Sequence, residues 1–577
     1  MKIAIPFVII IRALSFIIAR TYSGIIRFTS TKDAEKIFLA VLTGTIIIVF
    51  ANFIRYYLFD HKYIVPFSVI IIDFITTAFT LTAFRLAIKI LFIGISHSGK
   101  DKINILIYGT DELATITKRT VEHDHDNNYN VLGFIDDYSV KSHSTLEGIP
   151  IYHIDELEHL LKSENIVKLI ISKQNIKPDI KNRIVDYCLN NDVQVLNVPE
   201  VNSWINGELS FRQIKNFKIE DLLGREPIKL SVENIRKDVF QKTVLITGGA
   251  GSIGSEIARQ IIKFNPAKVI LYDQSETPLY DIEIELSEKL HYKNFEVAIG
   301  DITNEHRVDL LFRTFKPQIV YHAAAYKHVP LMENNPAEAV LVNIKGTKVV
   351  ADTASKYGTE KFIMISTDKA VNPTNVMGAS KRIAEIYTQI VNQRSKTNYV
   401  ITRFGNVLGS NGSVIPRFRK QIESGGPITI THPEVTRYFM TIPEACQLVL
   451  EAGSMGKGGE IFLFDMGKSV KILDLAKKMI KLSGLQLGKD IQIVYTGLRP
   501  GEKLFEELLC DAENTLPTHH PQIMIGKPQE NSFENLEEKI NKLIDGIFIL
   551  NNMEMVKLMK EIVPEYKSQN SIYETLD

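Results

Sequence analysis

The sequence predicts an α/β protein in which N-terminal transmembrane helices precede two Rossmann-like domains with parallel sheets. Apolar stretches with few charges occupy the beginning of the chain, and short apolar strands alternate with helix-length polar stretches from Ile103 onward. A glycine-rich turn then follows a strand that ends near Thr247. Because 577 residues exceed what one hydrophobic core usually supports, we expect several domains.

Composition and pattern divide the chain into four segments. We expect a membrane anchor over residues 1–95, a Rossmann-like domain over 103–225, a second one over 235–525 and a C-terminal helical tail over 526–577. A polar connector near Arg225 to Lys237 separates the two α/β patterns. The tail is charged and helix-patterned, and it contains no motif that indicates a function.

Two apolar runs, Ile37 to Phe53 and Ile64 to Ala83, are each close to the length that spans a bilayer. A third run, Ile3 to Ala19, contains Arg12, which is costly in hydrocarbon unless it faces other helices or lies at the interface. Lysines and arginines on both outer flanks favour a multi-pass protein of the inner (cytoplasmic) membrane, with both flanks in the cytoplasm. The alternative is a pair of buried helices in a soluble domain.

Charge and cysteine content exclude several classes of partner. Lys and Arg together number 67 and so do Asp and Glu, so a nucleic-acid partner is not predicted. Cys188, Cys446 and Cys510 are odd in number and have no metal-ligand spacing, as expected of ordinary thiols. The run from His123 to Asp126 resembles a solvated loop more than a metal site. We therefore predict no metal site.

The first Rossmann-like pattern begins with the strand that precedes Gly109. A dinucleotide site needs further glycines at this turn so that the backbone can approach a phosphate, and the segment from Thr110 to Ala114 has none. A degenerate nucleotide site is therefore favoured over a working one.

The second Rossmann-like pattern contains a complete dinucleotide motif. Gly248, Gly251 and Gly254 have the TGxxGxxG spacing, and the helix that starts at Ser252 and Ile253 would direct its N-terminal amides at phosphates. The next strand ends in Asp273, a carboxylate suited to the adenosine ribose diol, which favours NAD over NADP. Asp301 and Ile302 follow one strand later, where adenine would lie. The alternative is that the turn and the acids are unrelated to any ligand.

From this point the residues resemble the extended short-chain dehydrogenase/reductase family. The match continues through the segment from His322 to Pro330, which contains Ala323, and through Ser366-Thr367-Asp368-Lys369-Ala370. The chain is most similar to the family's membrane-anchored polysaccharide-biosynthesis branch, whose members are nucleotide-sugar 4,6-dehydratases. The resemblance implies a UDP-N-acetylglucosamine 4,6-dehydratase, expected to retain configuration at C5. Such an enzyme oxidises C4 with NAD, eliminates water and returns the hydride to C6.

The family's tyrosine–lysine pair is incomplete here, because Met377 stands where the tyrosine is expected, four residues before Lys381. The larger membrane-anchored dehydratases are similar in this respect. By resemblance Lys381 also contacts the cofactor, and proton transfer passes to Thr367, Asp368 and Lys369. We expect Lys369 to be the C5 base, with a lowered pKa, and Asp368 to be the acid, with a raised pKa.

Substrate contacts are expected mainly in later segments of the chain. The residues predicted to bind the UDP-sugar are Lys327, Asn406, Arg437, Arg499, Glu502 and Lys503. The arginines and lysines suit a diphosphate, while Glu502 suits a ribose hydroxyl. A homo-oligomer is also expected.

Three other functions compete with this interpretation. A UDP-sugar epimerase shares the cofactor motif, but C4 epimerases normally keep the tyrosine that Met377 replaces. A non-catalytic, nucleotide-sensing membrane regulator would not need Asp368 and Lys369. A phosphoglycosyl transferase would not need the glycine motif or Asp273.

Overall fold

The computed structural model describes residues 4–19, 21, 31–96, 103–122, 128–138, 144–199, 201, 204, 209–217, 219, 230–506, 515–526 and 535–577. The chain forms two compact units, Met1–Asn104 with Val121–Asn130, and Ile105–Thr120 with Val131–Asp577. The run from His123 to Asp126, the thiol of Cys510 and part of the polar connector lie outside the described residues.

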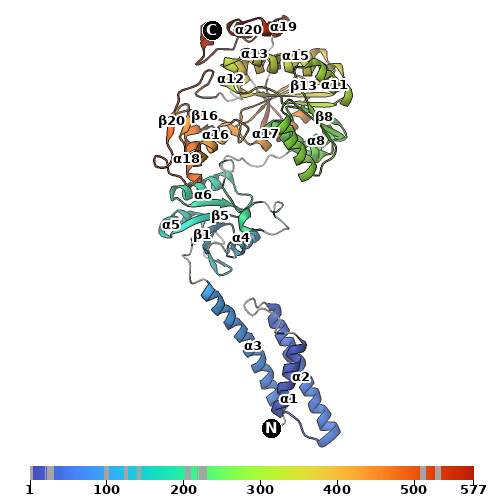
Figure 1. The fold of residues 1–577 in the computed structure, drawn as a ribbon, viewed down its shortest axis with the longest axis vertical. Helices are drawn as coiled ribbons and strands as arrows, with labels where there is room; N and C mark the ends of the chain where they lie inside the picture. Colours follow the sequence, from blue (N-terminus) through green and yellow to red (C-terminus); the bar gives the residue numbers. More distant parts are fainter. Residues whose placement is uncertain are drawn as a thin grey trace. The chain divides into compact units, whose positions relative to one another are not determined.

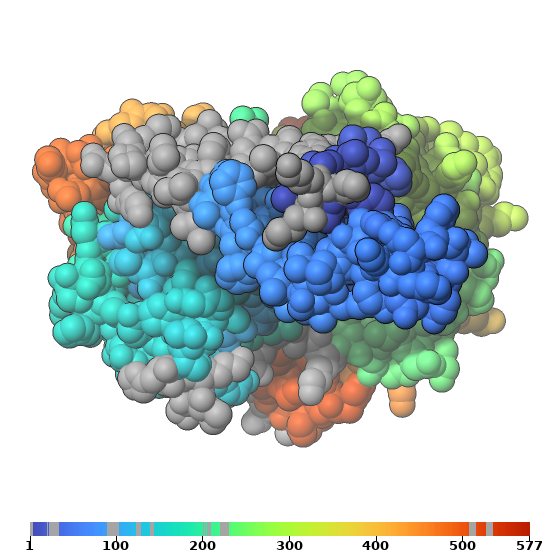
Figure 2. Space-filling model, turned by 90° about the horizontal axis from the view of Figure 1, so that it is seen from below, coloured from blue at the N-terminus to red at the C-terminus, as the bar shows by residue number. Residues whose placement is uncertain are grey.

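The N-terminal unit contains three apolar helices, α1 (Ala4–Ile18), α2 (Thr31–Arg55) and α3 (Phe67–Ser96). Within the described residues, two stretches are long and apolar enough to cross a membrane, Ala34–Asp60 and Phe67–Ile88. Large apolar side chains are exposed along both, for example Phe50 and Phe79, and those of α3 form part of the blue surface in Figure 2. The first predicted span is therefore helical over its whole length, and the second is helical from Phe67 onward.

Arg12 faces the other two helices, which is the first of the two arrangements open to it. Its Nε lies 3.0 Å from Oδ2 of Asp73 on α3, and its Nη2 lies 2.9 Å from Oγ1 of Thr45 on α2. The Arg12 side chain is only 8% exposed. A buried charge is costly unless paired, so this ion pair offsets the cost of placing arginine in an apolar helix.

The first Rossmann-like domain forms a sheet of seven strands among the described residues, in the order β3-β4-β2-β1-β5-β6-β7. The predicted strands are found as β1 (Ile103–Tyr108), β2 (Tyr129–Asp136), β5 (Ile166–Ile171) and β6 (Gln194–Asn197). The other elements are α4 (Glu112–Glu122), β3 (Thr145–Leu146), β4 (Ile149–His153), α5 (Leu157–Ser163), α6 (Pro178–Asn190) and β7 (Lys215–Asn216).

The second Rossmann-like domain has a sheet of nine strands among the described residues, in the order β10-β9-β8-β11-β12-β13-β18-β22-β21. Its first seven strands run parallel to one another. Strand β22 pairs antiparallel with β18, and β21 pairs antiparallel with β22. The strands are β8 (Thr243–Thr247), β9 (Lys268–Asp273), β10 (Phe295–Ile299), β11 (Ile319–His322), β12 (Lys361–Thr367), β13 (Asn398–Phe404), β18 (Ile461–Phe464), β21 (Thr515–Pro517) and β22 (Ile523–Gly526).

Helices cover both faces of this sheet (Figure 1). One set, α8, α9 and α17, packs together, and so does the set α11, α14 and α15. Their bounds are α8 (Val232–Val239), α9 (Ser252–Ile261), α10 (Glu276–Ile284), α11 (Glu305–Phe315), α12 (Val329–Asn334), α13 (Pro336–Ala339), α14 (Thr347–Lys356), α15 (Val376–Arg394) and α17 (Ile442–Met455). Because apolar strands are buried on both faces, they read as continuous apolar runs in the sequence.

A smaller lobe of short elements follows β13. It contains β14 (Asn406–Val407), α16 (Val414–Glu423), β15 (Ile428–Ile430), β16 (Thr436–Arg437), β17 (Phe439–Met440), β19 (Val470–Lys471), α18 (Ile472–Leu482) and β20 (Ile493–Tyr495). The chain then returns past residues 499–506 toward the end of β12, as the ion pairs of Glu506 described below show.

The C-terminal tail contributes to the core of the second Rossmann-like domain. Its helices, α19 (Leu536–Asp545) and α20 (Asn552–Ile562), pack on α15. Met559, Val563 and Tyr573 belong to the same apolar cluster as the central strands. The tail is thus a packing element, and its apolar helix faces are explained by this contact.

Candidate active site

The glycine turn lies at the topological switch point of the second sheet. Strand β8 lies between β9 and β11, so the order of the strands reverses at the β8–β11 pair, where open α/β sheets bind ligands. Gly248 has φ of +68°, and a Cβ atom there would lie 2.7 Å from the backbone nitrogen of Ala324. A Cβ on Gly254 would lie 2.2 Å from the carbonyl oxygen of Gly248. Only glycine therefore fits this close approach of turn, helix and strand.

The other predicted cofactor residues surround this turn. Asp273 ends β9, and its Oδ2 accepts a hydrogen bond from the amide of Ala250 at 3.1 Å. The amide of Ala323 bonds the carbonyl of Thr247 at 3.0 Å, which places the end of β11 beside the turn. A carboxylate in this position suits a ribose diol and disfavours a 2′-phosphate, so the residues present fit NAD.

Four more residues of this group follow the carboxyl ends of β8 and β10. Ser252 and Ile253 start α9, and the Ser252 hydroxyl accepts a hydrogen bond from the amide of Asn411 at 3.1 Å. Asp301 follows β10, and its Oδ1 accepts from the amide of Thr303 at 2.8 Å. Ile302 is buried. The N-terminal amides of α9 suit a pyrophosphate.

The predicted catalytic residues lie where β12 ends. Thr367 is the last residue of the strand, and its hydroxyl donates to Oδ1 of Asp368 at 2.8 Å. The same oxygen lies 3.1 Å from Nζ of Lys369. Both Asp368 and Lys369 line a cavity of about 280 Å³. The strand end thus presents an acid and an amine to one enclosed space.

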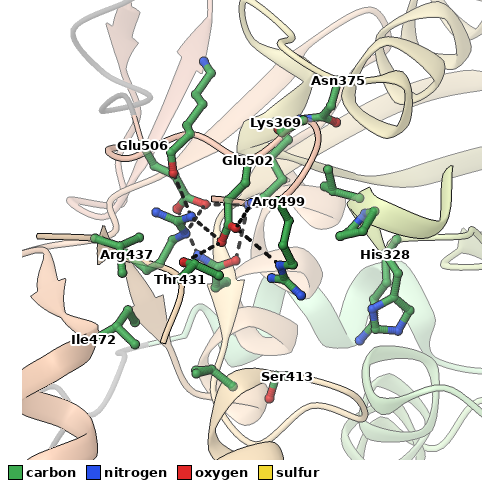
Figure 3. A pocket seen from close by; sticks show the side chains of 18 of the residues that line it. His328, Lys369, Asn375, Ser413, Thr431, Arg437, Ile472, Arg499, Glu502 and Glu506 are labelled. Carbon is green, nitrogen blue, oxygen red and sulfur yellow. Dashed lines mark hydrogen bonds and ion pairs between the residues drawn. The ribbon is translucent and has the colours of Figure 1, made fainter. Parts of the chain in front are cut away.

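A second carboxylate, which the sequence analysis did not identify, reaches the same amine. Oε1 of Glu506 lies 2.8 Å from Nζ of Lys369, and its Oε2 accepts from Nδ2 of Asn406 at 2.9 Å. The Glu506 side chain is only 7% exposed and lines the cavity. Figure 3 shows it between Lys369 and Arg437. Its position four residues after Glu502, in the same motif, was the sequence signal for it.

The electrostatic surroundings reverse two predicted pKa shifts. Burial alone would lower the pKa of Lys369, but the charges of Asp368 and Glu506 outweigh it and raise that pKa. Burial alone would raise the pKa of Asp368, but the charge of Lys369 and the hydroxyl of Thr367 lower it. The predictions of a lowered pKa for Lys369 and a raised pKa for Asp368 are therefore wrong for this geometry, because carboxylates surround the amine.

Burial lowers the pKa of two other lysines, Lys327 and Lys381. It lowers the pKa of Lys327, which lines the cavity. It also lowers the pKa of Lys381 to about 8, although the charge of Glu385 opposes the shift. Nζ of Lys381 donates to the carbonyl of Ile365 at 2.8 Å, so this lysine contacts β12. Met377, one turn earlier on α15, is buried in the apolar core cluster.

The low pKa of Lys381 predicts a pH-dependent stability. The unfolded chain keeps this amine protonated up to its ordinary pKa of 10.5, whereas the folded protein releases the proton near pH 8. The unfolded state then binds more protons between these values, so the free energy of unfolding rises with pH across this window. In denaturant titrations, Lys381→Met should lack this rise. An identical pH dependence in both proteins would contradict the prediction.

All six predicted substrate residues line the cavity, together with Asp368, Lys369 and Glu506. Arg437 is already engaged by the protein: its Nε lies 3.3 Å from Glu506, and its Nη2 donates to the carbonyl of Lys503 at 2.9 Å. Glu502 pairs with Arg437 and with Arg499, each at 3.3 Å. Arg437 and Glu502 therefore hold the 502–506 loop in this structure. Their contacts with a diphosphate and a ribose stay predictions.

Two residues that line the cavity have buried hydroxyl groups without a hydrogen bond to any described residue. Oγ1 of Thr374 and Oγ of Ser413 have no hydrogen-bond partner among the described residues. Both residues line the cavity. Since buried polar atoms are nearly always hydrogen-bonded, these two hydroxyls indicate a ligand with polar groups of its own.

The corresponding strand ends of the first Rossmann-like domain carry polar groups that pair with one another. The hydroxyl of Thr110 donates to Asp136, at the end of β2. Nζ of Lys173, after β5, pairs with Asp137 and lies 4.8 Å from the ring centre of Tyr138. These contacts agree with a degenerate site, which stays a prediction.

Two protein families match separate parts of this chain. Residues 244–528 match the family described as "Polysaccharide biosynthesis protein", and residues 21–199 match one described as "CoA-binding domain". A capsular polysaccharide biosynthesis protein, CapD, of Staphylococcus aureus is 46% identical over 434 residues, which cover 74% of this chain and 71% of that protein.

Two further matches cover about half of the chain. A UDP-N-acetylglucosamine 4,6-dehydratase (inverting) of Campylobacter jejuni is 33% identical over 319 residues, 53% of this chain and 91% of that protein. The solved X-ray structure of Pen from Bacillus thuringiensis is 36% identical, has a TM-score of 0.47, and covers 51% of this chain and 90% of that one.

Proposed function

Because the chain belongs to the polysaccharide biosynthesis family of extended short-chain dehydrogenase/reductases, we propose that it is a UDP-N-acetylglucosamine 4,6-dehydratase that uses NAD. The observation that carries this proposal is the pair Asp368 and Lys369 at the end of β12, inside a cavity that also holds the predicted substrate residues. The name of the Campylobacter relative supports the choice of sugar. The product would be a UDP-4-keto-6-deoxy sugar for a capsule or another surface glycan.

The chemistry divides between cofactor and protein. Gly248, Gly251, Gly254 and Asp273 would hold NAD at the glycine turn, and the bound cofactor would supply reversible hydride transfer at C4 and C6 of the sugar. A C4 carbonyl acidifies the neighbouring C5 proton, which Lys369 would remove as a neutral amine. Asn406 holds Lys369 through its Oδ1, at 3.3 Å from Nζ. The orphan hydroxyls of Thr374 and Ser413 offer hydrogen bonds to sugar or diphosphate oxygens.

An epimerase on the same substrate is the second candidate. Met377 weighs against it, because a thioether cannot transfer a proton and this side chain is buried in the apolar core. A non-catalytic regulator is disfavoured by the buried, hydrogen-bonded cluster around Lys369, since burying charged groups costs stability and such clusters in a cavity are typical of active sites.

The decisive experiment incubates the purified protein and NAD with UDP-N-acetylglucosamine in deuterated water. The expected product has lost one water and carries deuterium at C5, as measured by mass spectrometry and NMR. Retention at C5 is the expectation from family resemblance, and the NMR coupling at C5 separates it from the inverting outcome. A UDP-sugar of unchanged formula but altered configuration would make the chain an epimerase. Absence of turnover would favour the regulator.

We further propose that α2 and α3 anchor the protein in the inner membrane with the catalytic domain in the cytoplasm. The length and hydropathy of both helices and their exposed apolar side chains support this arrangement. The full chain should stay with membranes after alkaline extraction, and release into the soluble fraction would contradict the proposal. A homo-oligomer stays an expectation.

A further inference from the structure

Glu506 shares one ammonium group with Asp368. Nζ of Lys369 lies 2.8 Å from Glu506 and 3.1 Å from Asp368, and both carboxylate side chains are only 7% exposed. Two elements distant in the sequence supply them, the end of β12 and the loop after Arg499. The amine therefore has an acid on each of two sides.

The proposed reaction requires protonation states that this arrangement does not favour at rest. The C5 base must be a neutral amine, and the departing C6 hydroxyl needs an acid. Lys369, between two carboxylates, is held as an ammonium, and Asp368 is held as a carboxylate by Lys369 and Thr367. At rest, Lys369 is therefore not the neutral base that the reaction needs, and Asp368 is not the neutral acid.

We propose that Glu506 is a catalytic residue that accepts the ammonium proton of Lys369 and then donates it to the departing C6 hydroxyl. This inference rests on the proposed dehydratase function. In the first step one N–H bond of Lys369 breaks and one O–H bond forms on Oε1 of Glu506. The neutral amine then takes the C5 proton, and the Glu506 proton leaves with the C6 oxygen as water. Elimination thus ends with the original ammonium and carboxylate.

The surroundings of Glu506 suit a carboxylate that gains and loses a proton. Burial, with the nearby charge of Asp368, raises the pKa of Glu506. A weaker acid is a better proton acceptor, so transfer from Lys369 costs less than it would to an exposed glutamate. The Nδ2 group of Asn406 donates to Oε2 at 2.9 Å and to the carbonyl of Tyr438 at 3.3 Å, which fixes the carboxylate during the transfer.

Three charged groups face Lys369, from three different segments of the chain. Asp368 and Glu506 are acidic and raise the pKa of Lys369. The guanidinium of Arg437 on β16, which pairs with Glu506, acts in the opposite direction and lowers that pKa. Removing the charge of Glu506 should therefore lower the pKa of Lys369. An opposite charge at this distance typically shifts a pKa by about 1–3 units.

The test compares Glu506→Gln with the wild-type full chain, with NAD and UDP-N-acetylglucosamine in deuterated water. Water loss should fall by about 100-fold or more in the variant, since its amide cannot donate the proton. Because removing the charge of Glu506 lowers the pKa of Lys369, the amine can lose its proton to solvent and still exchange the C5 proton, so recovered UDP-N-acetylglucosamine should carry deuterium at C5. Glu506→Asp, which keeps an acid, should recover part of the activity.

A second measurement needs no substrate. Amine labelling of Lys369, followed by mass spectrometry across a pH series, should have its midpoint lower in Glu506→Gln by about one pH unit or more. Asp309→Asn removes the acid from the exposed Lys356–Asp309 pair, outside the cavity, and should change neither readout.

The outcomes distinguish the two proposals. Wild-type water loss in Glu506→Gln, or an unchanged labelling midpoint, would overturn the role of Glu506 while leaving the dehydratase intact. A raised KM without C5 deuterium in recovered substrate would reduce Glu506 to a loop anchor and also overturn it. A wild-type protein that releases no water would overturn the dehydratase itself, and with it the donation step, whatever the labelling shows.

Discussion

Replacing Lys369 with glutamine is expected to lower the rate of water loss from UDP-N-acetylglucosamine by about 10²- to 10⁴-fold, the usual contribution of a general base. The amide cannot accept the C5 proton at neutral pH, so deuterium incorporation at C5 should fall together with product formation. Both are measured in one incubation in deuterated water. The loss should appear in kcat more than in KM, because the C5 proton moves only in the transition state.

The control separates lost chemistry from lost charge. Lys369→Gln also removes the partner of two buried carboxylates, so binding of NAD and the melting temperature are measured in parallel. Lys356→Gln, which removes an exposed lysine paired with Asp309, should retain wild-type turnover. If Lys369→Gln keeps C5 exchange within tenfold of wild type, another group is the base.

Replacing Arg403 with methionine is expected to destabilise the second Rossmann-like domain by up to about 3–5 kcal/mol, the cost of removing one partner of a buried ion pair. Arg382, whose Nη1 lies 3.3 Å from Oε2 of Glu385, still compensates part of the buried charge. Nη2 of Arg403 lies 2.6 Å from Oε2 of Glu385, and the two side chains are 1% and 0% exposed. Nε of Arg403 adds a second contact of 2.9 Å to Oε1. Hydrogen exchange of the amides of β13 and α15 against denaturant measures the loss locally, which suits a multidomain chain.

A double variant tests the mechanism of that loss. Arg403→Met with Glu385→Leu removes both charges, so the double variant should recover much of the lost stability. Ser366 and Arg382 both donate to Glu385 and would lose this acceptor, which limits the recovery. If the double variant is no more stable than the single one, the unpaired charge is not the cause.

The Arg403–Glu385 ion pair contacts the elements that carry the predicted active-site residues. Glu385 belongs to α15, the helix that carries Met377 and Lys381, and Ser366 on β12 directly precedes the predicted catalytic residues. Arg403→Met should therefore reduce activity at temperatures where the domain is still folded. The effect follows from displacement of β12 relative to α15.

Local sequence determined the order of the elements and the cofactor turn. The spacing of Gly248, Gly251 and Gly254 requires a strand, a tight turn and a helix, and the structure has β8, the turn and α9 there. Asp273 was predicted at a strand end, and it is the last residue of β9. Asp368 directly follows β12. These predictions succeeded because apolar periodicity and glycine spacing act over a few neighbouring residues.

Only the tertiary structure decided which charges meet. Glu506 reaches Lys369 from a loop far along the chain, and the charges of Asp368 and Glu506 together reverse the predicted direction of the Lys369 pKa. Likewise, Arg12 is paired by Asp73 of another helix, and Arg437 is engaged by the 502–506 loop before any diphosphate. Sequence spacing fixes which residues a strand end presents, but a pKa depends on burial and on charges within a few ångströms in space. Those distances are set by packing between segments that the sequence keeps apart.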